Sequence, residues 1–182
     1  MLKAIDIANF FVDLANSDSD DCMTNLRVNK LIYFAQAWSL VRRKIPLFTE
    51  EIQAWTYGPV VQSVYQTFKG YGRDRIQCVH GEYSPDIFSS EELELLIDIA
   101  QYYGRFSSPA LVDITHADNS PWKRVFSENE NNIISQESLR EYFSTLTELK
   151  GFHLNELCED DFVGYRDKEG YLVLPREIFD AE

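Results

Sequence analysis

The side chains of this sequence that could perform acid–base or nucleophilic chemistry gather around one histidine. His116 lies between Asp113 and Asp118, and Ser120 follows four residues later. A catalytic base needs its nucleophile within hydrogen-bond reach, and residues that are neighbours in sequence rarely provide that geometry. His116 is better interpreted as a helix-end residue, favoured by the negative carboxyl end of the helix dipole. Since GxSxG, Walker, HExxH and GxGxxG motifs are also absent, we predict that the protein is not an enzyme.

Cysteine and histidine side chains could bind a metal ion only in combination. Cys78 and His80, together with His153 and Cys158, offer four potential ligands. Their spacing matches no zinc pattern, and a CxxC pair is missing. The three cysteines, of which Cys22 is the third, are odd in number and widely spaced, so they imply no disulfide framework. We therefore predict neither a metal nor a cofactor.

Basic residues form one local patch that could contact nucleic acid. Arg42, Arg43 and Lys44 follow a long apolar segment that carries Arg27 and Lys30 upstream. In a winged-helix fold such residues would belong to the recognition helix. The alternative is that residues 42–44 complement the carboxyl-terminal dipole of the long helix. The chain has 17 basic and 30 acidic residues, a net charge of −13, which argues against broad contact with phosphates and favours the alternative.

The acidic composition and the lack of long apolar runs limit the cellular setting. An acidic protein suits a partner with a basic surface. Asp6 and Asp13 interrupt the apolar character of the first residues, which differs from a signal peptide. No run approaches the roughly 20 apolar residues that span a bilayer. We expect a cytoplasmic protein without membrane contact.

Two helices are predicted in the first 41 residues. Residues 2–15 have an apolar stripe, with Asn9 among the residues on the polar side. Residues 26–41 are apolar over more than half of the circumference, which is typical of a helix in the middle of a domain. Either Thr24 or Asn25 could cap this helix. We expect it to be the structural spine.

Shorter elements follow the spine. The sequence predicts an extended segment over 52–55, a helix over 59–69 that starts at Pro59, and a second strand over 76–79. Ser89 and Glu92 fit a capping box that opens another helix. Leu93, Leu96, Ile97 and Ala100 would form its apolar face. Further helix starts are expected at Ser108-Pro109, Ser120-Pro121 and Ser135.

The last part of the chain differs in composition from the rest. Residues 151–182 contain nine acidic and three basic residues, and 162–165 and 171–174 read as two strands of a hairpin. We therefore predict a helical domain over 1–148 and an acidic extension over 149–182. The fold class is mainly α, within α+β. It comprises several helices around a central apolar helix, a small antiparallel β element and a carboxyl-terminal hairpin.

Three sequence blocks resemble the Panacea domain family, whose members include phage-associated proteins and SocA-like antitoxins. The blocks are RVNKLIYFAQAWSL, PLFTEEIQAWTYGPVVQSVYQTFKGYG and LVDITHADNSPW, within residues 5–146. They carry the family's hallmark residues in the family's order. These are Lys30, Leu31, Tyr33, Ala35, Gln36 and Trp38; Glu51, Ala54, Trp55, Tyr57, Gly58, Pro59 and Val60; and Thr115, His116, Pro121 and Trp122. The resemblance does not extend to the chain beyond Gly151.

The resemblance implies a helical antitoxin that neutralises a toxin by direct binding, typically a toxin encoded by an adjacent gene. Two other functions stay open. One is a winged-helix-like DNA-binding regulator that uses the basic residues above. The other is an adaptor that presents a partner protein to a protease, with the acidic extension as a handle.

A partner-binding surface is predicted around the second block. Trp55 is expected to pack against the spine, and Gly58-Pro59 to set the direction of the following helix. Tyrosine offers contact area at low entropic cost, which favours a rigid contact surface. The alternative, that the tyrosines fill the edge of the core, stays open. The candidate residues are Tyr57, Gly58, Pro59, Gln62, Tyr65, Gln66 and Lys69.

Overall fold

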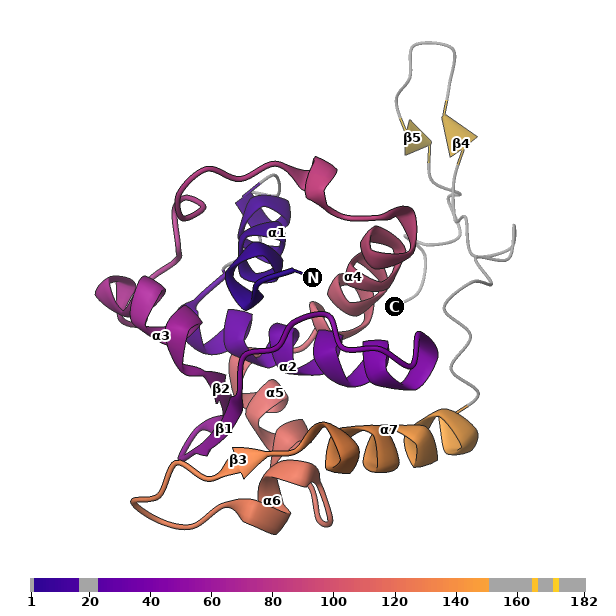
Figure 1. Cartoon of the computed structure of the whole chain (residues 1–182). Coiled ribbons are helices and arrows are strands. Elements are labelled where there is room, and N and C mark those ends of the chain that lie inside the picture. The colour runs from indigo at the N-terminus through magenta and orange to yellow at the C-terminus, as the bar shows by residue number, and fades with distance from the viewer. Residues whose placement is uncertain (1, 17–22, 151–164, 167–171, 174–182) are drawn as a thin grey trace, which may run out of the picture. The chain divides into compact units, whose positions relative to one another are not determined.

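The computed structural model describes residues 2–16, 23–150, 165–166 and 172–173 of the 182-residue chain. Contacts within the chain divide it into two units, Met1–Leu149 and Lys150–Glu182. The described residues form seven α-helices and a three-stranded antiparallel sheet, with a separate pair of short strands in the second unit (Figure 1). The predicted fold class, mainly α with a small antiparallel β element, is confirmed.

The predicted spine is α2 (Asn25–Arg42), whose residues 27–41 are all buried. Its cap is Thr24, whose side chain accepts a hydrogen bond from the Arg27 amide. Figure 1 shows α2 in the middle of the first unit. It packs against α1 (Ala4–Asn16), α4 (Ser90–Tyr103) and α5 (Ser108–Thr115), and also contacts α3 (Gln62–Phe68). A helix that is enclosed on every side has to be apolar around most of its circumference, as this one is.

An aromatic cluster joins α2 to α4 and to α7 (Gln136–Lys150). The rings of Phe34 and Tyr103 are stacked, with centroids 3.8 Å apart. Trp38 Nε1 donates a hydrogen bond of 3.0 Å to the Tyr103 hydroxyl, which satisfies both buried polar groups. Phe143 of α7 meets Phe34 and Trp38 edge-on. Burying such rings supplies much of the hydrophobic stabilisation of a domain of this size.

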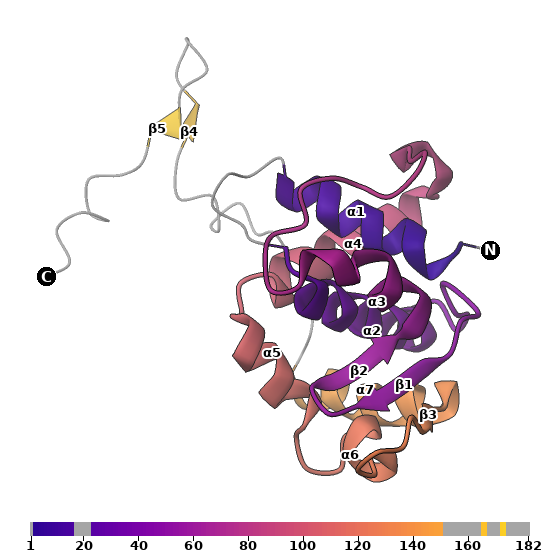
Figure 2. The same cartoon turned by 90° about the vertical axis from the view of Figure 1, so that its left-hand side faces the viewer.

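The sheet has the strand order β2-β1-β3 and lies between α3 and α6 in Figure 2. Strand β1 (Ile52–Trp55) pairs antiparallel with β2 (Gly58–Val61) across a turn at Thr56 and Tyr57, and with β3 (Ile133–Ile134) on its other side. The prediction of a helix from Pro59 is wrong, because 58–61 form β2 and α3 (Gln62–Phe68) begins after it. The hairpin register overrides the preference of proline for a first helical turn.

The outer edge of β2 is completed by two polar side chains of α2. Lys30 Nζ donates to the Pro59 carbonyl at 2.9 Å, and the Val61 amide donates to Asn29 Oδ1 at 3.0 Å. Pro59 itself has no amide hydrogen to satisfy. Each outward backbone group of a buried edge strand needs a partner, so the helix takes the place of a further strand. This arrangement explains the two polar residues in the middle of a buried helix.

Two predictions about the first unit are corrected by long-range hydrogen bonds. Asn9 is buried instead of lying on a solvent face, since its amide exchanges hydrogen bonds of 2.9 and 3.0 Å with the backbone of His80. Residues 76–79 form no strand. The Ile76 amide bonds to the Met23 carbonyl, and the segment is held by single contacts of this kind in place of a ladder.

The capping box of α4 is confirmed, because Ser89 and Glu92 exchange the two expected hydrogen bonds. Its apolar face is shifted from the prediction, and Ile97 is exposed. Asp98, on the buried side, pairs with Arg42 of α2 at 3.0 Å. The buried residues of α4 are Leu95, Leu96, Asp98, Ile99 and Tyr103.

The remaining helices of the first unit start close to where the sequence predicts. The caps are Ser107 for α5, Ser120 for α6 (Pro121–Val125) and Ser135 for α7. In the second unit, β4 (Tyr165–Arg166) and β5 (Leu172–Val173) pair antiparallel, as expected for the predicted hairpin. The other residues of the extension lie outside the described part of the chain.

Candidate functional site

Residues from all three sequence blocks meet at Gly58. A Cβ atom at Gly58 would lie 2.6 Å from Lys30 Cε and 2.7 Å from Thr115 Oγ1, which is closer than such atoms approach. Its φ of +97° is also unfavourable for any residue with a side chain. Glycine is therefore needed at position 58 for two reasons: the hairpin turn has a positive φ there, and the side chains of Lys30 from α2 and Thr115 from α5 leave no room for a Cβ atom. The three blocks build one structural junction.

An aromatic stack continues from this junction. The rings of His116 and Trp122 lie parallel with centroids 3.6 Å apart, and Phe126 stacks on Trp122 at 4.4 Å. Trp122 Nε1 donates a 2.8 Å hydrogen bond to the Trp55 carbonyl, which ties α6 to the end of β1. The histidine and tryptophan of the third block thus hold the β1–β2 hairpin in place.

The geometry around His116 does not place a nucleophile on the imidazole. The Ser120 hydroxyl donates to the Thr115 carbonyl at 2.8 Å and accepts from the Lys123 amide, so it serves as a helix cap. Among the described residues, Nε2 of His116 is buried without a hydrogen-bond partner. Burial lowers the pKa of His116, and the nearby charge of Lys30 adds to this effect. His116 lies at the carboxyl end of α5, as its position in the sequence indicates, and its ring packs on Trp122.

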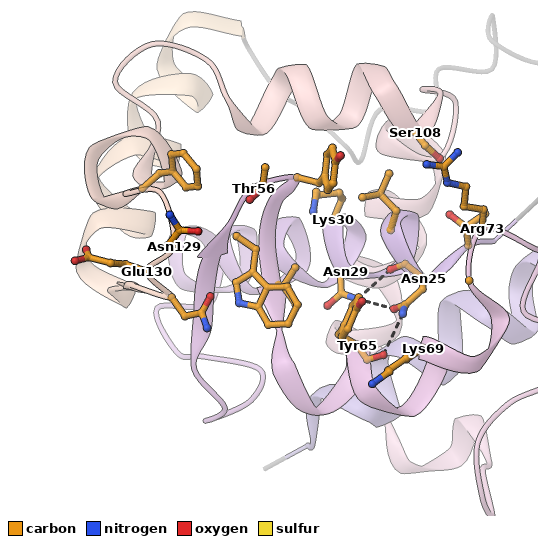
Figure 3. Close-up of a pocket in the computed structure, with 18 residues that line it drawn as sticks. Asn25, Asn29, Lys30, Thr56, Tyr65, Lys69, Arg73, Ser108, Asn129 and Glu130 are labelled. Atoms are coloured by element: carbon orange, nitrogen blue, oxygen red, sulfur yellow. Dashed lines mark hydrogen bonds between the residues drawn. The ribbon is translucent and has the colours of Figure 1, made fainter.

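A pocket of about 800 Å³ opens beside the junction (Figure 3). Its walls come from the start of α2, the β1–β2 turn, the segment from α3 to Arg73, the start of α5 and the loop 126–131. Figure 3 shows Asn129 and Glu130 at one end of the pocket and Ser108 and Arg73 at the other, with Lys30 between them. We name this pocket the hairpin pocket.

The walls of the hairpin pocket are held by a chain of amide hydrogen bonds. Asn29 Nδ2 donates to the backbone and side-chain oxygens of Asn25, and Asn25 Nδ2 donates to the Tyr65 carbonyl at 3.0 Å (Figure 3). Through Val61, Asn29 also holds β2. These bonds join α2, α3 and the hairpin, so the shape of the pocket is largely pre-formed.

Aromatic side chains form the accessible face beside the pocket. Trp55 and Tyr65 meet edge-on with centroids 4.8 Å apart, and both are half-buried. Trp55 is therefore not a fully buried core residue: it lines the pocket together with residues of α2, and its backbone carries the structural contact to Trp122. Tyr57, at the tip of the hairpin, is 70% exposed.

The pocket contains more positive than negative charge. Lys69 and Arg73 are exposed at its edge, Lys30 is fully buried beneath it, and Glu130 is the carboxylate among the described lining residues. Burial lowers the pKa of Lys30 to about 7, because an ammonium ion loses its hydration there.

The seven residues predicted as a partner surface divide into two groups. Tyr57, Gln62, Gln66 and Lys69 are exposed and Tyr65 is half-exposed, so they share an accessible surface. Gly58 and Pro59 are buried in β2, so their inclusion as contact residues is corrected. Both are instead needed to build the hairpin that carries Tyr57.

The basic residues predicted as an alternative nucleic-acid surface do not form one. Arg27 and Lys30 are buried, and Arg27 donates to the carbonyls of Gly104 and Phe106. Arg42 is paired with Asp98, and Arg43 lies 3.2 Å from Glu92 and 3.7 Å from Glu91. Lys44 is exposed. The prediction is wrong for Arg27 and Lys30 because α2 is enclosed on all sides.

Several residues of the pocket were not identified from the sequence. They are Asn25, Asn29, Arg73, Ser108 and the loop 126–131. The sequence does contain a signal for Asn29 and Lys30: two adjacent polar residues in an apolar helix predict buried hydrogen-bond partners. The sequence contains no comparable signal for Arg73 and the loop 126–131, because their position at the pocket depends on how distant segments pack.

Two other kinds of feature are absent from the described residues. No group of three or more His, Cys, Asp or Glu side chains is arranged to bind a metal ion there. Within the same residues, every helix is too short or too polar to cross a bilayer.

The family of the chain follows from comparison with known proteins. The family described as antitoxin SocA-like, Panacea domain, matches residues 28–123, which is more than half of the chain and contains the junction at Gly58. The chain belongs to this family. It is 33% identical over 130 residues to antitoxin SocA of Caulobacter vibrioides (strain NA1000 / CB15N), a match that covers 64% of this chain and 66% of that relative. No solved structure matches the chain.

Proposed function

We propose that the protein is an antitoxin that neutralises a toxin protein by binding it directly, without turning over a substrate. The observation that carries this proposal is membership of the SocA-like Panacea family, together with the likeness to a relative named as an antitoxin. The geometry agrees with it, because the three sequence blocks build a close-packed junction beside a pocket, and the Ser120 hydroxyl next to His116 serves as a helix cap and not as a nucleophile. The toxin is expected to be encoded by an adjacent gene and to meet the protein in the cytoplasm.

The contact surface we assign comprises Tyr57 and the outer side of α3, with Gln62, Tyr65, Gln66 and Lys69. Gln62, Gln66 and Lys69 are four and three residues apart, so they form one exposed stripe on α3 and the turn after it. Tyr57 projects from a hairpin whose backbone is fixed on both sides. An exposed tyrosine on a rigid support is suited to anchor a protein interface, because little entropy is lost on binding.

Co-expression tests the proposal. Expressed with the product of the neighbouring gene, the protein should restore growth and co-purify with that product as a complex. Tyr57→Ala should raise the dissociation constant about tenfold or more, as expected for an aromatic anchor. Ile87→Ala, which removes an exposed apolar side chain from a different segment, is the matched control and should leave it unchanged. A neighbour that is harmless, or that is toxic but never binds, contradicts the proposal.

A further inference from the structure

The hairpin pocket has a charge opposite to that of the chain as a whole. The chain carries a net charge of −13, whereas the described lining residues include Lys30, Lys69 and Arg73 against the single carboxylate of Glu130. Figure 3 shows Glu130 at the opposite end from Arg73, and Glu130 already accepts a hydrogen bond from Asn132 at 2.9 Å. The pocket therefore has one cationic end.

Two helices begin at this cationic end. The start of α2, with Thr24 and Asn25, and the start of α5, with Ser108, both line the pocket. The amino terminus of a helix carries a partial positive charge and favours anions. Both helices thus add to the positive potential that Lys69 and Arg73 create.

Lys30, with its pKa lowered to about 7 by burial, is only partly protonated near neutral pH, and an anion in the pocket would favour its charged form. Its ammonium is fully buried, and its hydrogen bond goes to a neutral acceptor, the Pro59 carbonyl. None of the described carboxylates forms an ion pair with it. A buried cation without a counter-ion gains stability when an anion approaches, because attraction is strong where water is excluded.

The wall next to the cationic end is apolar. Trp55, Val60 and Tyr65 line it, and Tyr57 stands exposed at its edge. A ligand that fits this arrangement combines a carboxylate with a large apolar side chain.

We propose that the hairpin pocket binds a segment of the partner toxin in which an acidic side chain stands next to a large apolar one. The carboxylate lies at the end formed by Lys69 and Arg73, and the apolar side chain packs against Trp55 and Tyr65. This inference rests on the proposed function for the identity of the partner. It adds that the partner supplies an acidic anchor even though the protein as a whole is acidic.

Charge reversal in the full-length protein tests the proposal. The affinity for the product of the neighbouring gene is measured for the wild type and for the double variant Lys69→Glu/Arg73→Glu. The control double variant is Lys3→Glu/Arg140→Glu, which makes the same change of charge at exposed residues outside the pocket. The pocket variant should bind at least about tenfold more weakly than the control variant. Both variants alter exposed side chains, and circular dichroism verifies that they fold.

A pair of peptides tests the pocket without the toxin. The probes are acetyl-Glu-Phe-Glu-amide and acetyl-Gln-Phe-Gln-amide, which differ only in their carboxylates, and amide chemical shifts of residues 55–73 report binding. The acidic peptide should shift these resonances and the neutral one should not. Equal shifts, or no shifts, with both peptides overturn the inference, as does equal affinity of the two charge-reversed variants for the toxin. A neighbour that fails to bind the wild type contradicts the proposed function instead, and the peptide result still decides the chemistry of the pocket.

Discussion

At the residue scale, Gly58 and Lys30 explain why the family's motifs contain the residues they do. Both lie at the point where the three blocks meet, and both are buried. Gly58 permits the close approach of α2 to the hairpin, and Lys30 completes the edge of β2. Residues that look like contact or phosphate-binding residues in the sequence are thus structural in the fold.

Gly58→Ala should destabilise the protein strongly. The new Cβ would overlap Lys30 and Thr115 and would stand on a backbone with positive φ, so we expect a loss of about 2 kcal/mol or more in the free energy of unfolding. Urea denaturation measures it. Gly70→Ala is the control, because nothing lies within 4 Å of its Cβ position. Equal stability of the two variants would show that the Lys30 side chain leaves room for a Cβ atom at position 58.

Lys30 should make the stability of the protein depend on pH. Its pKa falls from the ordinary value of 10.5 to about 7 in the fold, so between these values the unfolded chain binds a proton that the folded chain does not. Unfolding then becomes less favourable as pH rises. The free energy of unfolding of the wild type relative to Lys30→Met should rise by about 1.4 kcal/mol per pH unit between pH 7.5 and 9.5.

Chemical denaturation across this range measures the dependence on Lys30. Lys69→Met, which removes an exposed lysine, is the control. The difference between the wild type and this control should stay constant over the same range. A constant difference for Lys30→Met as well would mean that the Lys30 ammonium stays charged in the folded protein.

At the element scale, side chains of helix α2 form the hydrogen bonds that a neighbouring strand would otherwise form with the outer edge of β2. Asn29 accepts from Val61 and donates to Asn25, so one side chain holds the edge strand, the helix start and, through Asn25, α3. This explains how a three-stranded sheet with very short strands stays ordered beside an open pocket.

Removing the Asn29 side chain should open the hairpin pocket. Asn29→Ala leaves the Val61 amide buried without an acceptor, which costs about 1–3 kcal/mol. Hydrogen exchange of the Val61 amide should accelerate by the corresponding factor of about 5–150. Asn131→Ala, an exposed asparagine at the same pocket, is the control. Unchanged exchange at Val61 would mean that another group accepts this hydrogen bond.

At the scale of the whole molecule, the core of the first unit draws on nearly the whole length of that unit. The buried residues of the described part lie between Ala4 and Phe143. The domain boundary predicted after residue 148 stays a prediction. The acidic extension is also the predicted handle in the alternative in which the protein presents its partner to a protease.

A chain that ends at residue 150 should therefore fold cooperatively, with a free energy of unfolding within about 0.5 kcal/mol of the full chain. It should also keep its affinity for the toxin. The half-life of the toxin in cells tests the adaptor alternative. If the extension presents the toxin to a protease, the toxin should live longer in cells that express the truncated chain. A truncated chain that does not fold would show that the extension is part of the domain.

The family, the central helix and most helix starts could be predicted from the sequence, whereas the exposure of Tyr57 and Tyr65 was left open. The predicted features depend on local patterns, namely apolar periodicity, serine caps and proline after serine, which act within a few residues. The predictions for Gly58, Pro59, Arg27 and Lys30 were wrong, because their roles depend on partners 28 to 79 residues away in the chain.

Only the tertiary structure decided that the three motifs share one junction and that a pocket lies beside it. The sequence could show Lys30 and Asn29 as polar residues within an apolar helix, but it could not show which strand needed their hydrogen bonds. It also could not bring Arg73, Ser108 and the loop 126–131 to one pocket. The physical reason is that unsatisfied backbone groups and close packing are properties of an assembled edge or cavity, and these exist only once distant segments have met.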